Sequence, residues 1–422
     1  MSRVMHAAYA AATALAEPGL VLLLRRRAAR GKEVPSRLPE RQGRDATPRP
    51  PGRLLWLHAA SVGEAQSVLP VLAALDPGLH VLFTTGTVTS ARLLARRLPE
   101  LGLAGRVMHR FVPLDVPRWA ARFLDHWRPD AAAFVEAELW PNLLAGCRAR
   151  RIPAALVNAR ISARSAAGWR RRAPGLARTM LGGFAWIAAR SAEDAARLRG
   201  LGAASVTAPG DLKFAAAELP ADADALAALR DTIAGRPVWL AASTHPGEEA
   251  LVARVHATLA QAHRGLLTII VPRHPERGVA IAATLDAPRR SAGDGPPDSG
   301  VWVADTLGEL GLFYRAAGIV FVGKSLVGHG GQNPLEPARL GCAVAIGPHT
   351  DNFADAVALL ADAGGLAIVA DEAALASWVD AMLRDPARRE AAGAAARDAA
   401  SRHAGLPAEI AAMLVSLAMG AG

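Results

Sequence analysis

Cysteine, lysine and aromatic residues are scarce in this chain of 422 residues. The two cysteines, Cys147 and Cys342, are too few for a disulfide framework and suit a reducing compartment. Aromatic residues make up only 5%, and no basic run is interleaved with them, so the pattern gives no support to nucleic-acid binding. No zinc-type ligand spacing is present and no DxD-type metal motif stands out, and we therefore expect neither a metal nor a cofactor.

The positive charge comes almost entirely from arginine. Of the 48 basic residues only Lys32, Lys213 and Lys324 are lysines, and the net charge is +10. Heavy arginine use partly reflects genome composition. Arginine also matches phosphates with two donors at once, which favours a nucleotide or an anionic lipid as the partner.

A stretch that is almost free of charge lies at the N-terminus, between Val4 and Leu24. It is long enough to cross a bilayer, which takes about 20 residues. The basic run at residues 25–32 (RRRAARGK) favours a cytoplasmic position for everything after it. We expect residues 1–32 to form a membrane anchor, either spanning the bilayer or lying in its interface, and residues 33–52 to form a proline-rich tether.

Beyond residue 52, short apolar runs alternate with helical patterns in two sets. The first set occupies residues 53–214, the second occupies residues 236–422, and an Ala- and Asp-rich linker over residues 215–235 separates them. Such alternation is typical of parallel sheets with helices on both faces. The sequence therefore predicts two Rossmann-like domains that face each other across a cleft, with ligands outside the carboxyl ends of the strands.

Two motifs after predicted strands of the second set indicate a nucleotide site. PRHPER at residues 272–277 places Arg273 and Arg277 where guanidinium groups meet a phosphate or a carboxylate. In GHGGQNPLEPA at residues 328–338, Asn333 is the expected N-cap of a helix whose exposed N–H groups cradle a phosphate. Glu336, in the first turn of that helix, is then placed to accept hydrogen bonds from ribose hydroxyls.

Carboxylates follow the predicted strands of the first set. Glu64, in HAASVGE (residues 58–64), is either an ordinary helix-start charge or a catalytic base. In VEAELWPN (residues 135–142), alternation sends Glu136 and Glu138 to the same face of an extended segment. Lys213 stands at the end of the domain. For His245, in the second set, we weigh a structural turn residue and a ligand contact equally.

These motifs together resemble the signature series of the 3-deoxy-D-manno-octulosonic acid (Kdo) transferases, inverting glycosyltransferases of the GT-B fold. The matching segments, in order, are SVGE, ELWPN, NARIS, LKF, STHPGEE, VPRHPER, DTLGEL and GGQNPLEPA. The resemblance implies transfer of Kdo from CMP-Kdo to a lipid A precursor (lipid IVA). It also implies a place on the lipid surface of the bacterial inner membrane, with the catalytic domains on the cytoplasmic side.

Carried onto this sequence, the resemblance makes Glu64 the general base, and Glu138 with Lys213 a pair that stabilises the transition state. The expected CMP-Kdo contacts are Pro272, Arg273, Gly308, Glu309, Leu310, Asn333, Pro334, Leu335 and Glu336. Four residues depart from the family pattern, which usually has Thr, Asn, Gly and His where Ala137, Asp211, Lys324 and Gln332 stand.

Two alternatives stay open. One is another GT-B transferase that uses a different nucleotide sugar on an envelope lipid. The other is a membrane-tethered nucleotide-binding regulator without activity, although Glu64, Glu138 and Lys213 are all present. The arginines at 25–27, 164 and 170–172 are either contacts for the phosphates of the acceptor or a solvated surface.

Overall fold

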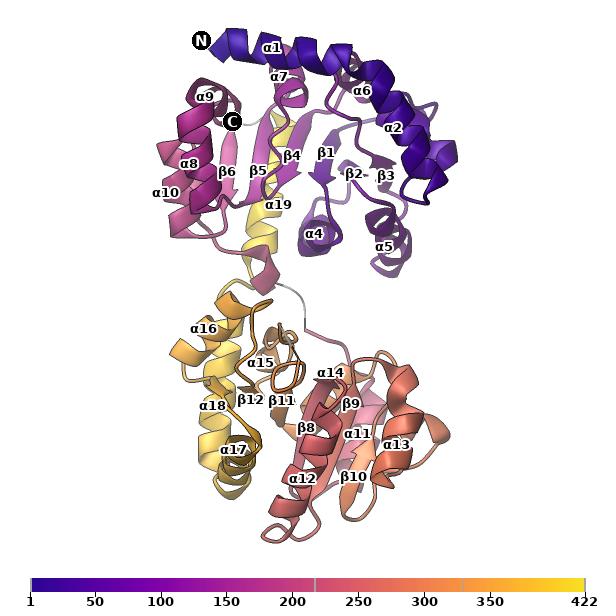
Figure 1. Ribbon diagram of the computed structural model, residues 1–422, viewed down its shortest axis with the longest axis vertical. Helices are drawn as coiled ribbons and strands as arrows, with labels where there is room; N and C mark the ends of the chain where they lie inside the picture. The colour runs from indigo at the N-terminus through magenta and orange to yellow at the C-terminus, as the bar shows by residue number, and fades with distance from the viewer. Residues whose placement is uncertain (1, 216–217, 329, 421–422) are drawn as a thin grey trace. The chain divides into compact units, whose positions relative to one another are not determined.

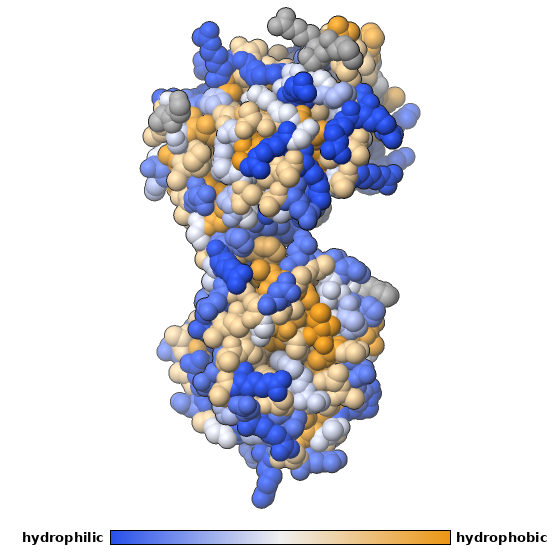
Figure 2. Space-filling model, turned by 90° about the vertical axis from the view of Figure 1, so that its left-hand side faces the viewer, coloured by the Kyte–Doolittle hydropathy of each residue, from blue (hydrophilic) through white to orange (hydrophobic). Residues whose placement is uncertain are grey.

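The computed structural model describes residues 2–215, 218–328 and 330–420. Their contacts divide the chain into two compact units. Unit 1 comprises residues 1–216 together with 405–422, and unit 2 comprises residues 217–404. On the face that Figure 2 presents, hydrophilic side chains are spread over the surface of each unit with apolar ones between them.

Unit 1 is built on a seven-stranded parallel sheet with the order β3-β2-β1-β4-β5-β6-β7 (Figure 1). Its central strands are buried along their whole length, as expected for a parallel sheet with both faces covered. The strands are β1 (Leu54–Ala59), β2 (His80–Thr85), β3 (Val107–Phe111), β4 (Ala131–Val135), β5 (Ala154–Ala159), β6 (Trp186–Ala189) and β7 (Val206–Thr207).

Helices cover both faces of the sheet of unit 1. Leu72 and Leu94 belong to the apolar cluster on one face, and Leu143 and Met180 to that on the other. The helices are α1 (Ser2–Leu15), α2 (Glu17–Ala29), α3 (Leu38–Arg41), α4 (Val62–Ala74), α5 (Val88–Glu100), α6 (Pro117–Trp127), α7 (Pro141–Ala149), α8 (Ala163–Arg172), α9 (Pro174–Leu181), α10 (Ala192–Gly200) and α19 (Leu406–Met419), with 3₁₀ turns η1 (Pro35–Arg37) and η2 (Leu212–Ala215).

Unit 2 has a six-stranded parallel sheet with the order β10-β9-β8-β11-β12-β13. Its strands are β8 (Val238–Thr244), β9 (Leu267–Pro272), β10 (Gly300–Val303), β11 (Ile319–Val322), β12 (Ala343–Ile346) and β13 (Leu366–Ile368). Its helices are α11 (Ala223–Thr232), α12 (Glu248–Ala260), α13 (Gly278–Leu285), α14 (Leu310–Ala317), α15 (Leu335–Arg339), α16 (Ala354–Asp362), α17 (Glu372–Arg384) and α18 (Pro386–Ser401), with 3₁₀ turns η3 (Pro275–Arg277) and η4 (Arg290–Ala292). The predicted pair of Rossmann-like units is confirmed.

Each sheet has one point where the direction of winding reverses. In unit 1 it lies between β1 and β4, and in unit 2 between β8 and β11. Ligands of such sheets bind outside the carboxyl ends of the strands at this point. The motifs predicted to form the site follow these strands and their neighbours.

The expected domain boundaries differ from the observed ones at the C-terminus. Helix α19, expected in the second domain, packs against α4 and lies along the sheet of unit 1 (Figure 1). Leu406, Ile410 and Leu414 are buried in the same apolar cluster as Leu72. Unit 2 therefore ends at residue 404, and α11, expected in a linker, packs on α14 within unit 2.

Residues 33–52 do not form an exposed tether. Glu33 and Arg41 are both buried, and their carboxylate and guanidinium lie 3.0 Å apart. Arg41 also donates to the carbonyl of Val112 at 3.0 Å, which fixes this segment to the end of β3. A buried ion pair needs such additional hydrogen bonds to offset its desolvation.

The N-terminal helices also pack on unit 1, since α1 contacts α6, α7 and α9. Among the described residues, no single helix is both long and apolar enough to cross a membrane. Val4–Leu15 and Glu17–Ala29 meet the length and composition only as a pair, and the two are bent by 56°.

Candidate active site

Glu64 lies in the first turn of α4, where the chain leaves the switch point of unit 1. Its carboxylate accepts the backbone N–H of Ala60 at 2.7 Å and the hydroxyl of Ser61 at 2.9 Å. Ser61, the N-cap of α4, in turn accepts the N–H of Glu64 at 3.3 Å, an arrangement that differs from a capping box only in that Glu64 takes the N–H of Ala60. These contacts place Glu64 at the helix start, and its role as the base stays a prediction. The same contacts hold a partly exposed carboxylate at the end of β1.

Glu136 follows the last residue of β4 and has a left-handed backbone, with φ at 60°. Its buried carboxylate lies 2.8 Å from Nε of Arg160 and 3.9 Å from Nζ of Lys213. Burial raises the pKa of Glu136, although the charges of Arg160 and Lys213 oppose the rise and that of Glu64 adds to it. Strained backbone of this kind concentrates at functional sites.

The carboxylate 3.9 Å from Nζ of Lys213 is that of Glu136, and the joint role of Glu138 and Lys213 stays a prediction. Glu138 instead lies 3.3 Å from Nε2 of His58 and accepts the indole N–H of Trp140 at 2.5 Å. Burial alone would raise the pKa of Glu138, but the hydrogen bonds of His58 and Trp140 lower it overall. Glu136 and Glu138 do not alternate along a strand, because β4 ends at Val135.

Lys213 is held in place through its backbone. Asp211 accepts the N–H of Lys213 and the amide N–H of Asn158, each at 3.0 Å. Asn158 returns a bond by accepting the N–H of Leu212 at 3.0 Å. Asp211, a departure from the family pattern, therefore anchors turn η2. Arg160 and Asn158 were missed as site residues, although both stand in the NARIS motif at the end of β5.

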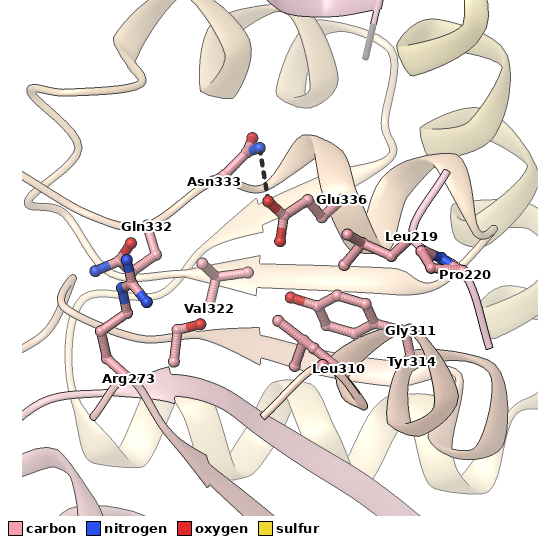
Figure 3. Close-up of a pocket in the computed structure, with 12 residues that line it drawn as sticks. Leu219, Pro220, Arg273, Leu310, Gly311, Tyr314, Val322, Gln332, Asn333 and Glu336 are labelled. Carbon is pink, nitrogen blue, oxygen red and sulfur yellow. Dashed lines mark hydrogen bonds between the residues drawn. The ribbon is translucent and has the colours of Figure 1, made fainter. Parts of the chain in front are cut away.

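A pocket of about 280 Å³ opens at the switch point of unit 2 (Figure 3). Ser243 of β8 and Val322 of β11 form its floor. Five of the predicted donor contacts line it, namely Arg273, Gly308, Leu310, Asn333 and Glu336. In Figure 3, Arg273 and Gln332 reach the pocket from one end, and Leu219, Pro220 and Tyr314 from the other.

The two arginines of PRHPER have different surroundings. Arg277 donates to both carboxylate oxygens of Glu249, at 2.7 and 3.1 Å. Arg273 is exposed at the pocket, and its guanidinium has no ion pair within the described part of the chain. An unpaired guanidinium is ready to bind an anion, so Arg273 is the stronger candidate.

Asn333 orients the acidic side of the pocket. Its amide N–H donates to Glu336 at 3.2 Å, and its carbonyl oxygen accepts the N–H of Leu335 at 3.1 Å. Burial raises the pKa of Glu336, and Asn333 and nearby arginines oppose the rise. The predicted phosphate cradle needs correction, because α15 starts at Leu335, spans five residues, and its first N–H is already bonded to Asn333.

The other predicted donor contacts do not line the pocket. Glu309 accepts from Nε of Arg290 at 2.7 Å and from the hydroxyl of Thr306, and the bonds from Arg290 lower its pKa. Pro272, Pro334 and Leu335 are buried around the pocket as supporting residues. Any ligand contact of Glu309 would therefore come from its backbone.

The apolar end of the pocket was not predicted. Tyr314 is fully buried, and Leu219 and Pro220 run across α14. A Cβ on Gly311 would lie 2.3 Å from the carbonyl oxygen of Pro220, so only glycine lets this segment pass so closely. The sequence signal for this wall was the three-residue spacing of Gly311 and Tyr314, which puts both residues on one face of a helix.

The architecture of the chain is shared with solved structures of the GT-B fold class. UDP-GlcNAc 2-epimerase from Neisseria meningitidis matches with a TM-score of 0.55 and 14% identity, over 86% of this chain and 99% of its own. MurG from Acinetobacter baumannii matches with a TM-score of 0.51 and 14% identity, over 86% of this chain and 99% of its own. At this identity the likeness concerns the fold.

The family follows from sequence. A family model described as 3-deoxy-D-manno-octulosonic-acid transferase matches residues 36–216. The 3-deoxy-D-manno-octulosonic acid transferase of Bordetella pertussis is 40% identical over 385 residues, which cover 87% of this chain and 88% of the relative. A probable mitochondrial 3-deoxy-D-manno-octulosonic acid transferase of Arabidopsis thaliana is 36% identical over 411 residues, 92% of this chain and 90% of the relative. The chain belongs to the Kdo transferase family, and it is a glycosyltransferase.

Proposed function

We propose that this Kdo transferase moves Kdo from CMP-Kdo to a lipid A precursor, lipid IVA, with inversion and with Glu64 as the general base. The observation that carries the proposal is the cluster of Glu64, Glu136, Arg160 and Lys213 at the switch point of unit 1. It brings a positioned carboxylate and two cations together at the end of the sheet where ligands bind.

Glu64 takes the proton of the attacking hydroxyl. The acceptor is a sugar hydroxyl, which needs a base as it forms the new bond. The bonds from Ala60 and Ser61 orient the carboxylate before the substrate arrives. No side-chain rearrangement is then required for the proton transfer.

Arg160 and Lys213 stabilise negative charge next to the base. Both side chains are about half exposed, with exposed fractions of 50% and 51%, while the carboxylate of Glu136 between them is buried. Glu136 lies between the two cations, and a carboxylate of the donor sugar approaches them from their solvent-exposed side. Prepositioned charges of this kind are a main source of catalysis.

The donor binds in the pocket of unit 2 with its phosphate at Arg273. The leaving nucleotide gains negative charge as the bond to the sugar breaks, and Arg273 stabilises it. Leu310 and Tyr314 pack against the nucleoside, and Glu336 accepts from its ribose hydroxyls. The pocket thus divides into an anion-binding end and a nucleoside-binding end.

The N-terminal helices lie on the cytoplasmic surface of the inner membrane. Leu15, Leu22 and Leu23 are exposed with fractions of 83%, 50% and 49%, and the exposed Arg25 and Arg26 follow them. Exposed apolar side chains next to basic ones suit an anionic lipid surface.

The arginines of α8 contact the phosphates of the acceptor. Arg164, Arg170, Arg171 and Arg172 are exposed, and no ion pair joins them to other described residues. Replacing Arg170, Arg171 and Arg172 by alanine should raise the KM for the acceptor and leave the KM for the donor unchanged. An unchanged acceptor KM would remove this part of the proposal.

The deciding experiment incubates the purified protein with CMP-Kdo and tetraacylated lipid A precursor, and reads the product by mass spectrometry. The product mass identifies the sugar and counts the residues added. If CMP binds but no Kdo is transferred, the acceptor assignment fails. If UDP displaces the donor and CMP does not, the protein uses a different nucleotide sugar.

A further inference from the structure

His58 stands at the switch point of unit 1 and is not used in the proposed mechanism. It is the last residue but one of β1, and its side chain is fully buried. Strand β1 pairs with β2 on one side and with β4 on the other, so the ring lies beside the point where the winding reverses (Figure 1). A buried polar side chain needs hydrogen-bond partners, and both ring nitrogens have them.

The ring reaches across the switch point to Glu138. Nε2 of His58 lies 3.3 Å from Oε2 of Glu138, which stands in the loop between β4 and α7. Although burial raises the pKa of Glu138, the hydrogen bonds from His58 and Trp140 lower it below its ordinary value, so the carboxylate is ionised at neutral pH. An ionised carboxylate only accepts hydrogen bonds. Nε2 of His58 must therefore carry a proton and donate to Glu138.

Buried groups of β1 and β2 hold the other ring nitrogen. Nδ1 of His58 lies 3.0 Å from Oγ1 of Thr84 and 3.1 Å from its carbonyl oxygen. The indole of Trp56, which can only donate, donates to the same hydroxyl at 2.8 Å. The hydroxyl proton of Thr84 then remains for Nδ1. Trp56, Thr84 and His58 thus form a buried chain that orients the ring and leaves a proton on Nε2.

The carboxylate of Glu138 is held through one of its two oxygens. His58 and Trp140 both donate to Oε2, Trp140 at a distance of 2.5 Å. Within the described ranges, no hydrogen bond or ion pair joins Oε1 of Glu138 to another residue. The side chain of Glu138 is 17% exposed, whereas that of His58 is fully buried. Oε1 is thus the oxygen left to accept a hydroxyl of a sugar substrate.

We propose that His58 is a positioning residue, which holds Glu138 so that its free oxygen accepts a sugar hydroxyl during Kdo transfer. The inference rests on the proposed function. Glu64, the proposed base, begins the helix that follows the same strand, and its carboxylate accepts the backbone N–H of Ala60. Strand β1 therefore orients two carboxylates of the site, Glu64 through the backbone and Glu138 through His58.

The test compares the kinetics of full-length wild type, His58→Asn and His58→Gln with CMP-Kdo and lipid IVA. An asparagine amide takes the position of Nδ1 and does not reach Glu138, whereas a glutamine amide takes the position of Nε2 and donates to it. We expect kcat to fall about 10²-fold in His58→Asn and to stay within about tenfold of wild type in His58→Gln. A raised KM for lipid IVA assigns the hydroxyl to the acceptor, and a raised KM for CMP-Kdo assigns it to the transferred sugar.

His109→Asn is the matched control. His109, on β3, is bonded by Nε2 to the hydroxyl of Thr85 at 2.9 Å, but its Nδ1 faces the guanidinium of Arg37 at 3.3 Å. The same replacement there should keep kcat within about twofold of wild type. Thermal unfolding of all variants shows how much stability each change removes, so that a loss of turnover is read apart from a loss of folding.

Unchanged kcat in His58→Asn, or equal losses in His58→Asn and His58→Gln, would show that His58 serves packing alone and would overturn the inference. NMR of isotope-labelled histidine rings gives a second measurement, which needs no substrate. Wild type should show a proton on Nε2 of His58, and a ring protonated on Nδ1 alone would also overturn the inference. Failure of wild type to transfer Kdo would instead overturn the proposed function, while the ring spectrum still decides whether His58 holds Glu138.

Discussion

The two units share one architecture but carry different kinds of site at their switch points. In unit 1 the charges are paired within the protein, with Glu136 between Arg160 and Lys213. In unit 2 the guanidinium of Arg273 has no ion pair among the residues described, and Glu336 is bonded to the neutral amide of Asn333. Paired charges hold catalytic groups in position, whereas an unpaired cation is available to an anionic ligand. On the proposed function, the same strand-end geometry serves chemistry in one unit and binding in the other.

The largest expected effect tests the catalytic side of this comparison. Glu64→Gln should lower kcat about 10³-fold, because an amide cannot accept the proton. Its amide oxygen still accepts the N–H of Ala60, so the helix start should persist. Turnover and CMP affinity are measured together, and CMP affinity should stay within about twofold of wild type. A variant that retains turnover would exclude Glu64 as the base.

Glu136→Gln should reduce kcat about 10²-fold, because Arg160 and Lys213 lose the carboxylate that fixes them. Burial raises the pKa of Glu136 above its ordinary 4.5, so the folded state binds this proton more tightly than the unfolded state does. The ionised carboxylate then costs stability as pH rises above the pKa of the unfolded chain, and no cost remains in acid. The midpoint of thermal unfolding should therefore be higher for Glu136→Gln than for wild type near pH 7. The difference between the two midpoints should disappear towards about pH 4. A constant difference would contradict the raised pKa.

Arg273→Ala tests the binding side and should weaken CMP about 10- to 100-fold, with little change in stability. Arg277→Ala is the matched control from the same motif. Its guanidinium is bonded to Glu249, so its loss should lower the unfolding midpoint more than that of Arg273. Calorimetry gives the CMP affinity of both variants, and thermal unfolding gives their stability. Equal losses of affinity would show that the two arginines are not divided in this way.

Gly311→Ala should weaken CMP several-fold and destabilise unit 2 by about 1–3 kcal/mol, as overpacking does. The new Cβ would lie 2.3 Å from the carbonyl oxygen of Pro220 and displace the wall of the pocket. Gly308→Ala serves as the comparison in the same pocket. Its Cβ would meet no atom within 4 Å, so it tests the strain of the backbone at a φ of 86° without overpacking. Affinity equal to wild type in Gly311→Ala would show that the segment at Pro220 does not contribute to binding.

The smallest effect is expected for Asp211→Asn, which restores the usual family residue. An asparagine oxygen still accepts the N–H of Lys213 and the amide of Asn158. Turnover should change by less than about threefold, since a neutral hydrogen bond replaces a charged one at an anchoring position. A loss comparable to that of Glu136→Gln would show that the charge of Asp211, and not its geometry, supports Lys213.

Strand-end placement was predictable from the sequence, and side-chain pairing was not. Apolar runs located β1 and β9, and the rule for parallel sheets then placed Glu64 and Arg273. The contact of Lys213 with Glu136 was not predicted, because β4 ends just before Glu136, whose left-handed backbone no sequence pattern indicates. The sequence did not indicate that α19 belongs to unit 1. The apolar pattern of a helix shows that one of its faces must be covered, but it does not show which of the two sheets covers it.

The return of α19 to unit 1 sets an order for folding during synthesis. Leu406, Ile410 and Leu414 complete an apolar cluster whose other members were made hundreds of residues earlier. Unit 2 is continuous from residue 217 to 404, so its core is complete before α19 leaves the ribosome. We therefore expect the unit made second to finish folding first, and the first-made unit to expose part of its core to chaperones until α19 has been made.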